Sequence, residues 1–92
     1  MKQTGTILNN QVEFLHFLKS KYPMYHQSNF FFRDLLFGVM AFLPLKKIRV
    51  TYQQAETVAK EVAVQFEKQN IFRRVNRQGW VVLYPEFSAG KN

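Results

Sequence analysis

Two clusters of cationic residues are the clearest indication of what this chain can bind. Its 13 Lys and Arg residues outnumber 6 Asp and Glu residues, which gives a formal net charge of +7 in 92 residues. Such an excess favours nucleic acid, an anionic membrane face or an acidic protein as partner, and a merely soluble basic protein is the alternative. Phosphate contacts from these cations are expected to be salt-sensitive and to carry little sequence specificity. The clusters are Lys46, Lys47 and Arg49, and Arg73, Arg74 and Arg77.

Three uncharged polar residues are candidates for contacts with base edges. Gln53, Gln54 and Thr57 lie at the start of an expected helix, and glutamine pairs with adenine. The same helix carries three glutamates against two lysines, whereas a helix in the major groove is normally cationic where it faces phosphates. A solvated polar face is therefore the competing interpretation.

Residue types that perform catalysis or bind metals form no recognisable site in the sequence. His16 and His26 have no partner at metal-ligand spacing, and the chain has no cysteine. The acidic residues are scattered, and there is no glycine-rich phosphate loop. We therefore expect no catalytic residue, no metal and no cofactor, and a protein that is not an enzyme. Residues 1–8 lack the apolar core of a secretory signal, so we expect a cytoplasmic protein.

Capping and stop signals divide the chain into three expected helices. Asn10 with Glu13, and Thr51 with Gln54, match the capping-box pattern. Asn70 is suited to the left-handed conformation that ends many helices. The expected helices span residues 11–22, 29–43 and 51–69, with Pro23 and Pro44 stopping the first two.

A basic hairpin is expected after the third helix. Residues 71–75 and 80–84 are rich in β-branched and aromatic residues, and the turn between them has Asn early and Gly late. Strand alternation places Arg73 and Arg74 on opposite faces and leaves Arg77 exposed at the turn. Trp80 either stacks on a base or covers the core.

The fold class is therefore α+β, with three helices followed by a two-stranded antiparallel hairpin. Residues 1–92 form a single domain, which we expect to be ordered from about residue 8 to 86, with a frayed tail at 87–92. Residues 46–50 either add a strand to the hairpin edge or form an extended loop. If they form a strand, the two cationic clusters converge on one edge.

The second expected helix is apolar on almost every side. Its phenylalanine content exceeds what a small domain readily covers, which predicts a homodimer through residues 30–43; coverage by the other two helices is the alternative. The uninterrupted apolar run, residues 35–45, is 11 residues long and contains Pro44. A membrane span needs about 20 apolar residues, so we expect none here.

The segment VAVQFEKQNIFRR, residues 62–74, resembles the end of the third helix and the first wing strand of winged-helix domains. The resemblance covers residues 51–84, and it implies that residues 76–79 are the tip of the wing. It also implies duplex DNA as partner and a role in transcriptional regulation. The connection at residues 45–50 departs from the family because it is too long and too charged for the usual tight turn. Winged-helix relatives also serve as protein-interaction modules, so an acidic protein is the alternative partner.

Overall fold

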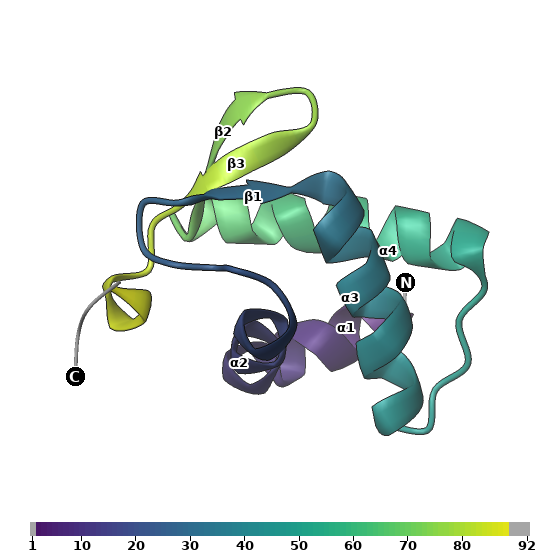
Figure 1. The fold of residues 1–92 in the computed structure, drawn as a ribbon. Coiled ribbons are helices and arrows are strands. Elements are labelled where there is room, and N and C mark those ends of the chain that lie inside the picture. The colour runs from purple at the N-terminus through teal and green to yellow at the C-terminus, as the bar shows by residue number, and fades with distance from the viewer. Residues whose placement is uncertain (1, 89–92) are drawn as a thin grey trace.

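Four helices and three short strands make up the described part of the chain, residues 2–88 of a computed structural model (Figure 1). An α+β class is therefore confirmed, although the numbers of helices and strands differ from those expected. The elements are α1 (Lys2–Asn9), α2 (Gln11–Lys21), β1 (Asn29–Phe31), α3 (Phe32–Leu45), α4 (Tyr52–Lys68), β2 (Phe72–Asn76), β3 (Gly79–Val82) and the 3₁₀ turn η1 (Pro85–Phe87).

The strands form one antiparallel sheet in the order β1-β3-β2, so the return strand of the hairpin is central. Phe30 of β1 lies opposite Trp80, and Phe72 of β2 lies opposite Val82. These four side chains are buried, and the sheet lies over the C-terminal half of α4 (Figure 1). The rings of Phe72 and Trp80 stack at 4.9 Å, which joins the sheet to the helical core.

The strand β1 is absent from the sequence-based prediction, which started a helix at residue 29. The chain remains extended through Phe31 and begins α3 at Phe32. Aromatic residues suit a half-buried strand, and pairing with β3 satisfies backbone groups that a helix start leaves free. Residues 46–50, for which a strand or an extended loop was expected, form a loop in which Lys47 has a φ of 61°.

The helix α1 was also not predicted, because order was expected only from about residue 8. Its Ile7 is fully buried and its Thr4 is 7% exposed. The capping box expected at Asn10 is wrong, since the Asn10 side chain donates to the Thr6 carbonyl and caps nothing in α2. Glu13 instead pairs with Lys46, 2.6 Å away.

The first residue of the C-terminal tail that was expected to fray packs against the rest of the chain. Phe87 is 2% exposed and lies in η1. Its ring packs edge-on against Tyr84 and His16, and its carbonyl accepts a hydrogen bond from the His26 N–H. Residues 89–92 of the expected tail lie outside the described residues.

Other helix boundaries follow the sequence signals closely. Thr51 and Gln54 form the expected capping box of α4, and Asn70 has the expected positive φ, 61°. Pro44, however, lies inside the last turn of α3, which ends at Leu45. A proline lacks the backbone N–H and so removes one hydrogen bond from a helix. In the final turn this loss does not interrupt the helix, because the helix ends at the next residue.

Within one chain, the other elements cover most of the apolar helix α3. Leu35, Leu36, Val39, Phe42 and Leu43 are buried. A Cβ atom on Gly38 would lie 2.3 Å from Leu18 Cδ2, so glycine permits close contact between α2 and α3. The aromatic rings left exposed in this region are Phe31 and Phe37, at 48% and 44%. None of the described helices has the length and apolar character needed to cross a membrane.

Candidate nucleic-acid interface

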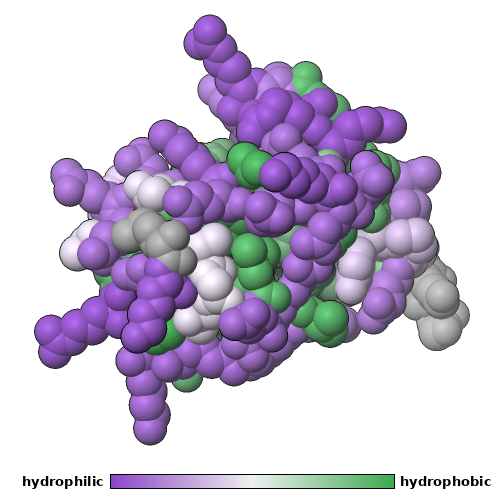
Figure 2. All heavy atoms as spheres, turned by 180° about the vertical axis from the view of Figure 1, so that it is seen from behind, coloured by the Kyte–Doolittle hydropathy of each residue, from purple (hydrophilic) through white to green (hydrophobic). Residues whose placement is uncertain are grey.

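An exposed stripe of three polar residues and one valine runs along α4 on the side away from the core. Its members are spaced three or four residues apart, which places them on one helical face. The opposite face, from Ala55 to Phe66, packs into the core. Figure 2 shows the molecule from behind the view of Figure 1, and hydrophilic residues cover most of that face, with hydrophobic areas small and separate. We name this the outer stripe: Gln53, Thr57, Lys60 and Val64.

Of the three residues expected to read bases, two lie on the outer stripe and one does not. Gln53 and Thr57 are exposed there. The Gln54 side chain accepts a hydrogen bond from the Thr51 N–H at 3.0 Å, and its carbonyl oxygen also lies 3.5 Å from the Gln3 amide nitrogen. Gln54 therefore closes the capping box and faces α1.

Two of the three α4 glutamates are engaged in contacts within the protein. The Thr4 hydroxyl of α1 donates to Glu61, and this hydrogen bond is the largest cause of a lowered Glu61 pKa. Glu67 lies toward the hairpin, where its carboxylate accepts from Trp80 Nε1 at 2.7 Å and lies 3.2 Å from Arg74. These two glutamates therefore lie on opposite sides of the outer stripe, Glu61 next to α1 and Glu67 next to the hairpin.

The three hairpin arginines have different surroundings. Arg73 and Arg74 point to opposite faces of the sheet, as strand alternation predicts. Arg74 stacks over Trp80 at 5.1 Å, and its Nη1 donates to the carbonyl oxygens of Asn76 and Arg77 at 3.0 and 3.3 Å. Much of the Arg74 donor capacity is thus used inside the protein. Arg77 is exposed at the hairpin turn, which consists of Arg77 and Gln78.

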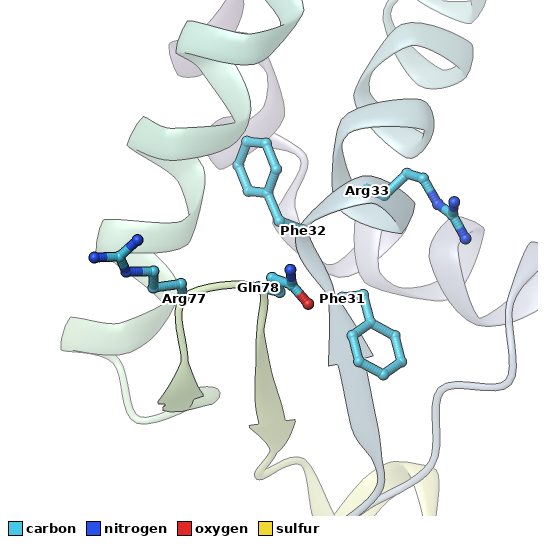
Figure 3. A pocket seen from close by; sticks show the side chains of 5 residues that line it. All are labelled: Phe31, Phe32, Arg33, Arg77 and Gln78. Carbon is cyan, nitrogen blue, oxygen red and sulfur yellow. The ribbon is translucent and has the colours of Figure 1, made fainter.

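Two recesses meet at this turn. The helix-side recess, of about 320 Å³, lies between α4 and the hairpin. The strand-side recess, of about 460 Å³, lies beside the end of β1 (Figure 3). Phe32 and Arg77 line both of them. Within the described part of the chain, no carboxylate lines either recess, and the cations that do so are Arg33, Lys60, Arg74 and Arg77.

The second cationic cluster lies elsewhere. Lys47 and Arg49 line a shallow hollow before the N-terminus of α4, whereas the hairpin packs against the C-terminal half of that helix. Lys46 turns away from both, toward Glu13 on α2. The two clusters therefore do not converge on one sheet edge, because residues 46–50 form a loop and not the strand on which that convergence depended.

Sequence reasoning missed several residues that line the recesses. Lys60 and Val64 follow Gln53 and Thr57 at helical spacing, so the periodicity of α4 contained the signal that would have found them. Phe31 and Arg33 had no such signal, since their position depends on β1 joining the sheet beside the hairpin turn.

Trp80 and the two histidines, which lie outside the recesses, have contacts within the protein. Trp80 is fully buried, so of its two expected roles the structure shows the core one. His26 Nδ1 accepts a hydrogen bond from the Tyr84 N–H at 3.0 Å. His16 Nε2 lies 3.5 Å from the Glu86 carboxylate. Among the residues described, no three His, Asp or Glu side chains are grouped so as to hold a metal ion.

Comparisons of this chain with protein-family models, with curated proteins and with solved structures give no match.

Proposed function

We propose that this chain is a winged-helix-like domain that binds duplex DNA through the outer stripe of α4 and the hairpin. The order of its elements supports the resemblance, since α3 and α4 form a consecutive helix pair and the hairpin follows directly. The strand β1 pairs with β3 and so links the hairpin to the start of α3. The longer connection between α3 and α4 remains a departure from the family.

The observation that carries the proposal is the uncovered outer stripe beside a recess lined with cations. Lys60 belongs to the stripe and lines the helix-side recess together with Arg77. Glu67 is paired with Arg74, whereas Glu61 accepts a hydrogen bond from Thr4 and stays ionised on the side of α4 that faces α1. Phosphate groups beside the hairpin would therefore meet the cations Lys60 and Arg77.

The dimensions of the major groove suit this arrangement. A helix with its side chains is about 10–12 Å across, and the major groove of B-form DNA is about 12 Å wide. With α4 in the groove, Gln53 and Thr57 reach base edges near its N-terminus. Lys60 and Arg77 contact the phosphate backbone beside it, which fixes the position of the helix without reading sequence.

A protein-interaction module is the second candidate, and it is favoured by the exposed apolar residues of α3. Phe37 and Leu45 are 44% and 65% exposed and lie eight residues apart on one helix. They do not line the cationic recesses, so a partner bound there would leave DNA binding unaffected. Two results together would favour this candidate. The wild-type chain would bind an acidic protein but not DNA, and substitution of Phe37 would abolish binding to the acidic protein.

The test is duplex DNA binding measured by fluorescence anisotropy across a salt series. Arg77→Ala and Lys60→Ala should each weaken binding and make the slope of log affinity against log salt shallower by roughly 0.9 per lost phosphate contact. Arg73→Ala is the matched control, because it removes the same charge from the opposite face of the hairpin and should change the slope less. Undetectable binding at low salt, or identical slopes for all three variants, would contradict the proposal.

A further inference from the structure

The strand-side recess lies on the side of the hairpin turn that faces away from α4. A straight duplex bound to the outer stripe could make its proposed contacts without entering this recess. Figure 3 shows Arg77 directed toward α4, whereas Phe31 and Arg33 lie on the other side of Gln78. The recess shares Phe32 and Arg77 with the helix-side recess. The two recesses are therefore adjacent at the hairpin turn.

Phe31 offers a flat aromatic surface in this recess. Its ring is 48% exposed, although its backbone is fixed by pairing with Gly79. A Cβ atom on Gly79 would lie 3.1 Å from Phe31 Cδ1, so the ring packs closely over the bare glycine backbone. The ring is thus held in place from one side and open on the other, which is the arrangement that a stacking surface requires.

The charges around this ring are positive. Arg33 and Arg77 line the recess with Phe31, Phe32 and Gln78. The neighbouring carboxylate of α3, Asp34, is not among the residues that line the recess. An exposed aromatic ring in a recess that two arginines also line, with no carboxylate in the described lining, suits a ligand that combines a flat apolar part with negative charge.

We propose that the strand-side recess binds an unpaired nucleotide that extends from the end of a duplex. The base stacks on Phe31, and the flanking phosphates contact Arg77 and Arg33. The recess volume, about 460 Å³, lies within the range of roughly 300–1,000 Å³ that is usual for small-ligand sites. The inference rests on the proposed function and specifies its substrate as duplex DNA with a single-stranded extension. Paired bases inside a duplex have no free face to offer, whereas an unpaired base does.

The test compares three probes that share one duplex sequence: a blunt duplex, the same duplex with a short unpaired extension, and that extension built from abasic sugars. The abasic probe keeps the added phosphates and removes the stacking partners. We expect the wild-type chain to bind the probe with bases at least about fivefold more tightly than the abasic probe, since one stacked base commonly contributes this much or more.

Substitutions at Phe31 locate the effect. Phe31→Leu keeps an apolar contact with Gly79 but has no aromatic face, so it should abolish the preference for bases in the extension, and Phe31→Trp should retain it. Tyr25→Leu is the matched control: Tyr25 is 42% exposed beside Lys19 at 4.3 Å, outside both recesses. Circular dichroism would verify that each variant is folded.

The outcomes separate the two proposals. If blunt duplex binds and wild type shows no preference between bases and abasic sugars, the nucleotide site is refuted while duplex binding stands. A preference that survives Phe31→Leu, or that disappears equally in Tyr25→Leu, also refutes it. Failure of all three probes to bind refutes both proposals together.

Discussion

At the scale of single residues, Glu67 links α4 to the hairpin. Trp80 is fully buried, and its indole N–H needs a hydrogen-bond partner, which the Glu67 carboxylate supplies at 2.7 Å. The same carboxylate oxygen lies 3.2 Å from Arg74. One side chain thus satisfies a buried donor and pairs with a half-exposed cation, and the two contacts should differ greatly in their value to stability.

Substitution of Glu67 separates these contributions. Glu67→Ala leaves the Trp80 N–H without its partner, which should lower the free energy of unfolding by about 1–3 kcal/mol. Glu67→Gln keeps an acceptor for Trp80 and loses only the partly exposed ion pair, so its cost should stay within about 1 kcal/mol. Urea unfolding of both variants measures the difference. Equal losses would show that the indole hydrogen bond contributes little.

Local signals in the sequence were sufficient where neighbouring residues supply the contact. The Thr51 and Gln54 capping box and the Asn70 stop depend on atoms within a few residues, and both were predicted. Asn10 has the same local pattern, but α1 continues directly into α2 and the Asn10 amide binds the Thr6 carbonyl instead. The role of Trp80 depends on Glu67 across the fold, so the sequence left two alternatives open.

At the scale of elements, α1 closes one flank of α4. Ile7 is fully buried and Thr4 donates to Glu61. Gln11, at the start of α2, exchanges two hydrogen bonds with Gln69 at the end of α4, at 2.7 and 3.0 Å. These contacts hold α4 on the side opposite to the hairpin. The outer stripe therefore lies between α1 on one side and the hairpin on the other.

Removal of the Ile7 side chain tests how much α1 contributes. Ile7→Ala creates a cavity in the core, so it should lower the free energy of unfolding by about 2–5 kcal/mol, a large part of the roughly 5–15 kcal/mol usual for a domain. Val12→Ala is the control, since Val12 is 59% exposed and should change stability within about 0.5 kcal/mol. Thermal and urea unfolding provide the comparison. An Ile7→Ala loss as small as that of the control would mean that α1 is dispensable.

The short strand β1 shows why the candidate site was only partly predictable. A run of three phenylalanines next to a helical pattern fits the start of a helix as well as a strand, and only the open edge of β3 decides between them. Outer-stripe residues follow from the period of α4, which is local. Phe31 and Arg33 reach the recess only because β1 pairs with β3, and that pairing joins residues about 50 positions apart.

At the scale of the whole molecule, the chain separates a cationic surface from an exposed apolar one. Phe37 and Leu45 lie four residues either side of Ala41 on one face of α3. Large apolar side chains exposed together on a helix are typical of contact surfaces between proteins. Self-association through α3 therefore remains our prediction, although it now rests on fewer residues than the apolar composition of this helix indicated.

Light scattering tests this prediction. We expect a dimer for the wild-type chain and a monomer for Phe37→Glu, because a buried, unpaired charge at the interface opposes association. Arg77→Ala should remain dimeric, and circular dichroism should show both variants to be folded. A wild-type monomer at high protein concentration would exclude the α3 interface.

Hydrogen bonds hold the hairpin turn on two sides, which should increase the rate at which a partner binds. The Phe32 N–H of α3 donates to the Gln78 carbonyl at 2.7 Å, while Arg74 joins the turn carbonyls to Glu67 of α4. Folding has therefore already removed most of the conformational entropy of this turn, and a partner need not order it on arrival. Association should then be limited by diffusion and orientation, and long-range attraction between the positively charged chain and a polyanion should accelerate it.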